Sequence, residues 1–438
     1  MSGYDNARIA AELKQALAPL DIVPIEEELR DEPALGGLRR ARRLREEDPV
    51  AVLSLLDIDG VLIWEDGAVT ASTSRTRRRG GMAVEGEVVT QLKFSKELGA
   101  NDIARKLEQL DQRLTPQGPA RLLAWDPKQW QSSELAEPVS ADSALLLIHG
   151  TFSNSQNMMD EFQSTDEGVA FLRKAAKYDR VLSFDHFTLS RSPWINALDL
   201  ARLLEPHQFK TLDVICHSRG GLVTRWWLEL VNRKELKATR AIFVGCPLHG
   251  TSLADPQSLR HGLNLLTNIG KFLGEACRLI PMLTAAGGLM QIVSSIGGFA
   301  AKAPLVDAAI AMIPGLAAMS RTQTNFELDA LNQGNPAARA GYSAVLSDFE
   351  PDPDIGWRFW RLFNLDRLSN AAGDYLVFNQ ANDLVVDTES MTFHAFGPTP
   401  ALGNRDAFCC FSKSSKVFHT NYFRSPETLE FLAARLGI

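Results

Sequence analysis

Short apolar runs that alternate with amphipathic segments are the feature that most restricts the fold of this 438-residue chain. From about residue 140 the runs are ALLLIHG (144–150), RVLSFDH (180–186), TLDVICHS (211–218), RAIFVGCP (240–247) and YSAVLSDF (342–349). NALDLARLLEPH before the third run and GGLVTRWWLELVNR after it have the apolar spacing of helices. Strands that are apolar throughout belong to parallel sheets with helices on both faces. The sequence therefore predicts a mainly parallel α/β sheet over residues 140–438.

Residues 1–139 follow a different pattern. Short β-prone runs separated by Gly, Asp and Pro have the sequences AVLSLL, VLIWEDG, AVTAST, GEVVTQLKF and ARLLAWD. Residues 6–18, which precede them, carry apolar side chains at helical spacing. These features predict a small N-terminal α+β module whose role the sequence does not indicate. The arginine-rich stretches 39–48 and 73–81 are typical of a solvated helix surface and an exposed hairpin loop rather than of binding patches.

The composition disfavours several classes of protein. A net charge of −7 offers no basic field to a phosphate backbone, so we expect no nucleic-acid partner. The five cysteines form no CxxC pair and there is no HExxH motif, so we expect no metal and no cofactor. The scattered cysteines, together with an N-terminus that lacks the apolar run of a signal peptide, predict a cytoplasmic protein. The oligomeric state is not indicated.

An apolar segment at 256–325 interrupts the alternation of strands and helices. It carries no charged residue from Leu279 to Ala301, which is long enough to raise the question of a membrane span. A proline, a glutamine, two serines and paired glycines at 287–288 and 297–298 are expected to break this run into short helices. We therefore predict a helical cap over the functional site that could contact a lipid interface transiently. Buried structural helices and a membrane span are the alternatives.

The segment DVICHSRGGLV (213–223) runs from a strand through a tight turn into a helix, with Ser218 at the turn. This is the arrangement of a nucleophile elbow, in which a strained serine holds its hydroxyl clear of the sheet. Small residues are needed two positions before and after the serine because the strand and the helix nearly touch there. Cys216 and Gly220 meet that need, and His217 supports the turn. The sequence thus predicts Ser218 as a catalytic nucleophile.

A second loop is expected to stabilise negative charge. The run ALLLIHGTFSN (144–154) places His149 and Gly150 at the end of a predicted strand. The glycine lets the loop turn over the site, so that the backbone N–H of Thr151 can donate to an oxyanion. The second donor is the backbone N–H of Arg219 at the start of the following helix. Because His149 ends an early strand, we expect it to support this loop rather than to act as a base.

A catalytic serine needs a base, and the base needs a carboxylate that orients it. With a turn of this kind the chain order is serine, then acid, then histidine. His419 in KVFHTNYF, a short β run that ends in a loop, is the preferred base, and His394 is its rival. Asp383 in QANDLVVDTESM is the preferred acid, although Asn-Asp is also common turn chemistry. Its rivals are Asp348, Asp387 and Asp374.

Several of these motifs resemble one known group of proteins. HGTF, CHSRGG, VGCPLHGTSLAD, NDLVV and HTNYF are together similar to the lipase and esterase branch of the α/β hydrolases, including bacterial lipases and lecithin:cholesterol acyltransferase-like proteins. The resemblance covers residues 140–438. It implies the α/β-hydrolase fold and a catalytic triad of Ser218, Asp383 and His419.

The chain also departs from the pattern of that branch. It keeps a P-x-x-G-T turn at 247–251, after which a lid is expected. Cys216 and Arg219, however, occupy positions where glycine and methionine are familiar, and Leu384 stands where the acid loop often has glycine. These differences leave the predicted nucleophile unchanged, but they do not point to a particular subfamily.

We therefore expect a serine hydrolase that cleaves carboxylic esters through an acyl-enzyme. The expected substrate, an acyl ester or another lipid-like small molecule, rests on the resemblance and on the apolar 256–325 segment. One alternative is an acyltransferase that uses the same acyl-enzyme with an alcohol or thiol acceptor. The other is a non-catalytic protein of the same fold in which 256–325 binds lipid or a partner.

Overall fold

The computed structural model divides the chain into two compact units. The small unit is formed by residues 1–110, 256–312 and 357–376, and the large unit by residues 111–255, 313–356 and 377–438. The structure describes residues 6–20, 22–24, 50–58, 60–66, 75–76, 84–85, 87–95, 100–232, 240–254, 262–264, 267–268, 276–296, 313–321, 325–333, 341–350, 381–392 and 407–438.

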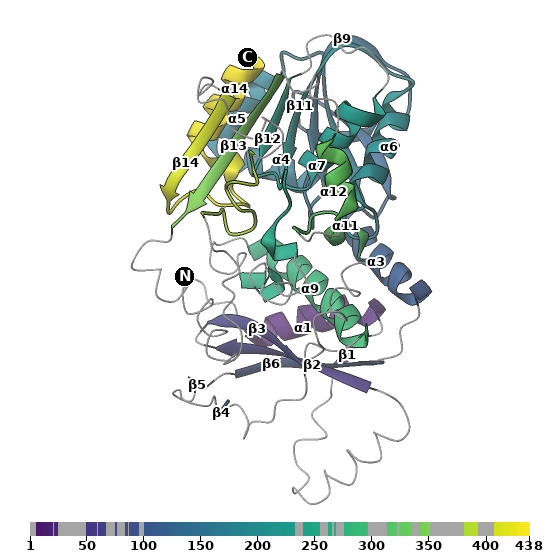
Figure 1. Cartoon of the computed structure of the whole chain (residues 1–438), viewed down its shortest axis with the longest axis vertical. Helices are drawn as coiled ribbons and strands as arrows, with labels where there is room; N and C mark the ends of the chain where they lie inside the picture. The colour runs from purple at the N-terminus through teal and green to yellow at the C-terminus, as the bar shows by residue number, and fades with distance from the viewer. Residues whose placement is uncertain are drawn as a thin grey trace, which may run out of the picture. The chain divides into compact units, whose positions relative to one another are not determined.

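An eight-stranded, mainly parallel sheet forms the centre of the large unit (Figure 1), with the strand order β14-β13-β12-β11-β9-β10-β7-β8. Strands β9 to β14 run parallel to one another, whereas β7 is antiparallel to both β10 and β8. The strands are β7 (Ala120–Trp125), β8 (Ser132–Glu134), β9 (Ser140–Ile148), β10 (Arg180–His186), β11 (Gln208–His217), β12 (Ala241–Val244), β13 (Tyr342–Phe349) and β14 (Phe408–Ser414). The five apolar runs correspond to β9 through β13, so the predicted α/β sheet is confirmed.

The boundary between the two parts lies earlier than the sequence suggested. The run ARLLAWD, which we assigned to the N-terminal module, forms β7 and pairs with β10 over six residue pairs from Val181↔Trp125 to His186↔Ala120. The large unit accordingly begins at Asp111 rather than at residue 140. A short β-prone run does not reveal its partner strand, because antiparallel pairing across some 60 residues of chain is a tertiary event.

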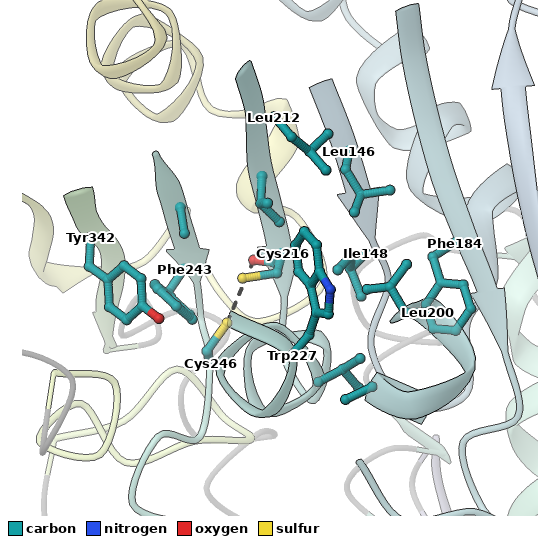
Figure 2. Close-up of a cluster of buried hydrophobic side chains, with 14 of the residues drawn as sticks. Leu146, Ile148, Phe184, Leu200, Leu212, Cys216, Trp227, Phe243, Cys246 and Tyr342 are labelled. Atoms are coloured by element: carbon teal, nitrogen blue, oxygen red, sulfur yellow. Dashed lines mark hydrogen bonds between the residues drawn. The ribbon is translucent and has the colours of Figure 1, made fainter. Parts of the chain in front are cut away.

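The two faces of the large sheet are covered by different helices. Side chains alternate along β9, so that Leu146 and Ile148 pack with α6 and α7, whereas Leu145 and Leu147 pack with α4, α5 and α14. Figure 2 shows the first of these two clusters, in which Trp227 lies among residues of the central strands. The helices are α4 (Ser155–Gln163), α5 (Asp166–Ala175), α6 (Pro193–Leu204), α7 (Gly220–Trp226, continued by a π-helical stretch over Trp227–Val231), α11 (Pro314–Ala317), α12 (Phe326–Asn332) and α14 (Pro426–Leu436).

The small unit combines an antiparallel sheet, in the order β1-β6-β2-β3, with helices. It is not built from the N-terminal part alone, because residues 256–312 and 357–376, which we assigned to the α/β domain, belong to it as well. Its elements are α1 (Asn6–Leu17), a 3₁₀ turn (Ala18–Leu20), β1 (Val23–Pro24), β2 (Val50–Ile58), β3 (Val61–Asp66), a separate pair β4 (Arg75–Thr76) and β5 (Val84–Glu85), β6 (Glu87–Ser95), α9 (Ala276–Ile296) and the first turns of α3 (Ala100–Leu114).

One helix corrects an expectation from the sequence. Residues 279–296 of the uncharged run lie in the single 21-residue helix α9, which continues through the glycine pair 287–288 that was expected to break it. The second glycine pair, 297–298, lies outside the described residues. A Cβ at Gly288 would lie 3.0 Å from Leu110, and one at Gly287 would lie 3.4 Å from Trp64. The glycines are therefore retained inside a helix because they allow close packing, which outweighs their low helix propensity.

The segment that contains α9 is also tied to the small sheet by hydrogen bonds. Asn268 accepts from Leu62 N at 2.8 Å and donates to Leu62 O at 2.7 Å, and Asn264 accepts from Trp64 N at 3.0 Å. These side chains satisfy backbone groups along the edge strand β3. Among the described residues, none of the helices combines the length and apolarity that a bilayer span requires. That residues 256–325 cover the functional site stays a prediction.

Candidate active site

The turn after β11 has the backbone strain expected of a nucleophile elbow. Ser218 has φ of 53°, in the left-handed region that a residue with a side chain rarely adopts. Its backbone N–H donates to Val244 O at 3.0 Å, which joins the turn to the end of β12. A Cβ at Gly220 would lie 2.5 Å from Ile148 O, so only glycine fits where α7 begins against β9.

Cys216 takes the position of the more usual glycine without distorting the strand. It is fully buried, and its backbone carbonyl accepts from Cys246 Sγ at 3.6 Å (Figure 2). Burial raises the pKa of the Cys246 thiol well above its ordinary value, so this thiol stays protonated. The pair therefore fills the space under the elbow as small apolar side chains.

His419 lies against Ser218. Its Nε2 is 2.9 Å from Ser218 Oγ, and its side chain is almost completely buried. It sits in the loop after β14 and not in a β run, because the last strand is FCCFSKS and ends at Ser414. Two hydrogen bonds hold this loop: His217 Nε2–H donates to His419 O at 2.8 Å, and Ser347 Oγ donates to Val417 O at 2.7 Å.

Asp383 completes a relay that starts at the serine. Its Oδ2 lies 2.8 Å from His419 Nδ1, and its Oδ1 accepts from the backbone N–H groups of Val385 at 3.1 Å and Val386 at 2.8 Å. A carboxylate can only accept, so Nδ1 carries the proton and Nε2 is free to accept from the serine hydroxyl. The acid is fully buried, and its own carbonyl accepts from His419 N at 3.0 Å.

Two residues of this relay were missed in the sequence. Tyr422 donates from its hydroxyl to Asp383 Oδ2 at 2.9 Å, as a fourth donor to the carboxylate after Val385 N, Val386 N and His419 Nδ1. Gly245 has φ of 56°, and a Cβ there would lie 2.7 Å from Tyr422 and 3.1 Å from Asp383 Oδ2. Both residues stand next to motifs that the sequence does show, the end of a predicted strand and HTNYF. Only the fold, however, brings them to Asp383.

The acid loop contains a strained leucine. Leu384, which stands where this loop often has glycine, has φ of 84°. Its backbone N–H donates to Asn382 Oδ1 at 2.9 Å, which closes a local Asx turn. The side chain is buried, so apolar packing compensates for a backbone conformation that glycine would adopt without strain.

The predicted oxyanion donors are near the nucleophile and available. A Cβ at Gly150 would lie only 2.6 Å from Ser218 Cβ, so the loop after β9 passes directly over the serine. Within the described part of the chain, the backbone N–H groups of Thr151 and Arg219 have no acceptor. The next residue, Phe152, has φ of 56°, which turns the loop sharply. Two unpaired donors beside the serine can bind an oxyanion.

The ring of His149 is hydrogen-bonded to the backbone of this loop and of β10. Its Nδ1 is 2.9 Å from Gly150 O and its Nε2 accepts from His186 N at 3.3 Å, so both ring nitrogens are engaged by the backbone. The ring stacks on His186 with a centroid distance of 4.1 Å. Burial lowers the pKa of His149, which keeps the imidazole neutral.

The rival acids lie in other environments. Asp387 Oδ2 forms an ion pair with Arg321 Nη1 at 3.1 Å and accepts from Ser252 Oγ at 3.1 Å, so it anchors the loop. Asp348 is near Cys410 and raises the pKa of that thiol, after the larger effect of burial. The remaining rivals, Asp374 and His394, lie outside the described residues. Among the described residues, His, Cys, Asp and Glu side chains form no group of three that could hold a metal ion.

Several solved structures are similar to this chain. They include the lipase BlEst2 of Bacillus licheniformis (14% identity, 73% of this chain and 98% of that one, TM-score 0.41) and Lipase 1 of Pelosinus fermentans (14%, 66% and 98%, 0.36). Another is the Cif epoxide hydrolase of Acinetobacter nosocomialis (10%, 78% and 98%, 0.37). At these TM-scores the likeness says nothing further about activity.

The fold itself rests on this chain's own features. The mainly parallel sheet with one antiparallel strand, the strained serine between strand and helix, and the chain order of Ser218, Asp383 and His419 are those of the α/β hydrolases. No curated protein matches the sequence. The family described as "Domain of unknown function (DUF7379)" matches residues 117–437, and the chain belongs to it.

Proposed function

We propose that the protein is a serine hydrolase that cleaves carboxylic esters through an acyl-enzyme. The observation that carries the proposal is the buried relay of two hydrogen bonds, 2.9 Å between Ser218 Oγ and His419 Nε2 and 2.8 Å between His419 Nδ1 and Asp383 Oδ2. A hydroxyl is a weak nucleophile at neutral pH, and a histidine oriented by a carboxylate is what activates it.

The reaction has two halves that use the same groups. Ser218 Oγ attacks the acyl carbon while its proton passes to His419 Nε2, and the carbonyl oxygen becomes an oxyanion held by the N–H groups of Thr151 and Arg219. When the tetrahedral intermediate collapses, the alcohol leaves with the proton from His419, and the acyl group stays on Ser218. Water then attacks the acyl carbon by the same route and releases the acid. Asp383 stays ionised and keeps the imidazole in its tautomer.

The surroundings of the donors favour an uncharged acyl group. Phe152 is partly exposed beside Thr151, and the Sδ of the buried Met319 lies 3.7 Å from Thr151 Oγ1. An apolar acyl chain is stabilised by contact with such side chains, whereas a charged group would be desolvated without a partner. This observation supports acyl esters as the substrate class.

The test is turnover of p-nitrophenyl acetate, butyrate, octanoate and palmitate together with fluorophosphonate labelling. We expect Ser218→Ala to lose labelling and to lower kcat by about 10⁴- to 10⁶-fold, because it removes the attacking atom. Ser183→Ala is a matched control, since Ser183 is buried in β10 and accepts only from Trp125 Nε1, at 2.8 Å, among the described residues.

The two variants separate loss of chemistry from loss of folding. Ser183→Ala should keep both labelling and turnover at wild-type levels. Wild-type hydrolysis by folded Ser218→Ala would overturn the proposed function, and so would a folded wild-type protein that neither reacts with the probe nor hydrolyses any of the four esters.

A further inference from the structure

The loop between β10 and α6 touches both sides of the predicted oxyanion hole. Thr188 Oγ1 accepts from the backbone N–H of Phe152 at 3.4 Å, and Phe152 directly follows Thr151. Farther along the same loop, Arg191 O accepts a hydrogen bond from Arg219 Nη2. The position of this loop therefore influences the two residues whose backbone N–H groups would hold the oxyanion.

One carboxylate holds the loop in place. Asp111 Oδ1 accepts from the backbone N–H groups of Thr188 at 2.8 Å and Leu189 at 3.0 Å, and Oδ2 accepts from that of Ser190 at 2.8 Å. The hydroxyls add two more bonds, Ser190 Oγ to Oδ2 at 2.7 Å and Thr188 Oγ1 to Oδ1 at 3.3 Å. Consecutive N–H groups directed at one buried carboxylate make charge-assisted hydrogen bonds, which are stronger than neutral ones.

Asp111 lies outside the part of the chain that defines the family. It sits in the last turn of α3 and precedes the matched residues 117–437. Residues 100–110 of the same helix belong to the small unit, and Asp111 is the first residue of the large unit. The helix that enters the large unit thus supplies a buried acid to a loop on the carboxyl side of the sheet.

We propose that Asp111 is a positioning residue for the oxyanion hole, which it orders through the loop at 187–191. This inference rests on the proposed ester hydrolysis. Asp111 touches neither substrate nor nucleophile. Its hydrogen bonds hold the loop that contains Thr188 and Arg191. Thr188 Oγ1 in turn accepts from Phe152 N, and Arg191 O accepts from the side chain of Arg219. Misplacement of an oxyanion donor weakens binding of the transition state more than binding of the substrate, so the effect belongs in kcat.

Asp111→Asn tests the role of the carboxylate with little change of shape. The amide replaces one acceptor oxygen with an NH₂ donor. In either orientation it faces a backbone N–H, that of Thr188 or that of Ser190, and breaks that bond. We expect kcat on p-nitrophenyl butyrate to fall by about 10- to 100-fold with KM changed less than about threefold. The amides of 188–190 should exchange with deuterium faster than in the wild type.

Asp213→Asn is the matched control for loss of a buried carboxylate. Asp213 is fully buried in β11, accepts from Tyr178 OH at 2.6 Å and pairs with Arg240 Nη2 at 2.6 Å. This variant should lower stability while leaving kcat and the exchange of 188–190 near wild-type values. Should Asp111→Asn fail to fold, Thr188→Val keeps the backbone bond to Asp111 and removes the hydroxyl, which accepts from Phe152 N and donates to Asp111 Oδ1. A several-fold fall in kcat is expected.

The outcomes separate this inference from the proposed function. A folded wild type that neither reacts with the fluorophosphonate probe nor hydrolyses any of the esters overturns both. A folded Asp111→Asn with unchanged exchange at 188–190, or with faster exchange and wild-type kcat, overturns the inference alone, as does an equal fall of kcat in Asp213→Asn. Wild-type kcat in Thr188→Val overturns the link to Phe152.

Discussion

The two sides of the candidate site each contain a buried histidine, but the two rings have different hydrogen-bond partners. On the acid–base side (residues 381–387 and 417–422), His419 places its ring nitrogens against a hydroxyl and a carboxylate. On the oxyanion side (residues 148–152 and 184–191), His149 places both against backbone groups, Gly150 O and His186 N. The first ring can pass a proton to a partner that reacts, whereas the second can only hold a loop.

This difference shows that the role of a histidine depends on the hydrogen-bond partners of its two ring nitrogens. Burial alone does not distinguish the two rings, since both side chains are nearly inaccessible. His149 has no lone pair left for a substrate, because Nε2 already accepts a backbone N–H. A histidine next to a glycine at the end of a strand is therefore a poor guide to a catalytic base unless its partners are known.

The largest expected effect comes from exchanging each histidine for asparagine. His419→Asn should lower kcat/KM by about 10⁴-fold or more, because the general base is lost. His149→Asn should lower kcat/KM by less than about tenfold. It should, however, destabilise the fold by about 1–3 kcal/mol, because backbone groups that bond to the imidazole would be left unpaired. Ester turnover and urea unfolding of both variants check the pair. Equal losses of kcat/KM in the two variants would contradict different roles for the two histidines.

The oxyanion side should also make stability depend on pH. Burial lowers the pKa of His149, and burial followed by the charges of His149 and Arg219 lowers that of His186 well below 6.5. A depressed pKa in the fold means that the unfolded chain binds the proton more readily, so the stabilisation is complete above pH 6.5 and is lost as the pH falls below it. Each histidine contributes a slope of up to about 1.4 kcal/mol per pH unit.

Urea unfolding at pH 7.5, 6.0 and 5.0 measures this slope. His186→Phe removes one of the two groups and keeps an aromatic ring next to Phe184, whose centroid lies 5.0 Å from that of His186. The variant should lose less stability between pH 6.5 and 5 than the wild type does. The same slope in both proteins would show that the acid sensitivity originates elsewhere.

The hydroxyl of Tyr422 gives Asp383 a further hydrogen bond. Burial and the nearby Asp383 raise the pKa of Tyr422 well above its ordinary value, so it remains a donor to that carboxylate. Tyr422→Phe should lower kcat/KM by about tenfold, the size of one hydrogen bond to a charged group. Asp383 keeps three other hydrogen bonds, with Val385, Val386 and His419, so larger losses are not expected. The pH profile of kcat/KM, compared with Tyr178→Phe as a control, provides the measurement.

The smallest expected effect concerns backbone strain, which each side carries at one bulky residue, Phe152 and Leu384. Both Leu384→Ala and Leu384→Gly remove a buried side chain and should destabilise the protein by about 2–5 kcal/mol. The glycine variant should be the more stable of the two by about 1 kcal/mol, since only glycine adopts the φ of 84° without strain. An alanine variant as stable as the glycine variant would argue against stored strain at this position.

Local patterns in the sequence predicted the elements that depend on neighbouring residues. The apolar runs predicted β9 to β13, and the strand, turn and helix around Ser218 predicted its strained backbone. The chain order of nucleophile, acid and base then led to Asp383 and His419. The predicted boundary near residue 139 and the predicted helix break at residues 287–288 were wrong, because both depend on packing partners distant in the chain.

By itself, the sequence determined the sheet, the nucleophile turn and a short set of candidates for the acid and the base, because strand propensity, glycine placement and chain order are local or one-dimensional properties. Only the tertiary structure decided which carboxylate meets His419, that Tyr422 and Gly245 complete its surroundings, and that Asp111 reaches the loop at 187–191. These contacts join segments distant in sequence. Their distances and burial set the strength of each hydrogen bond, and no residue pattern encodes them directly.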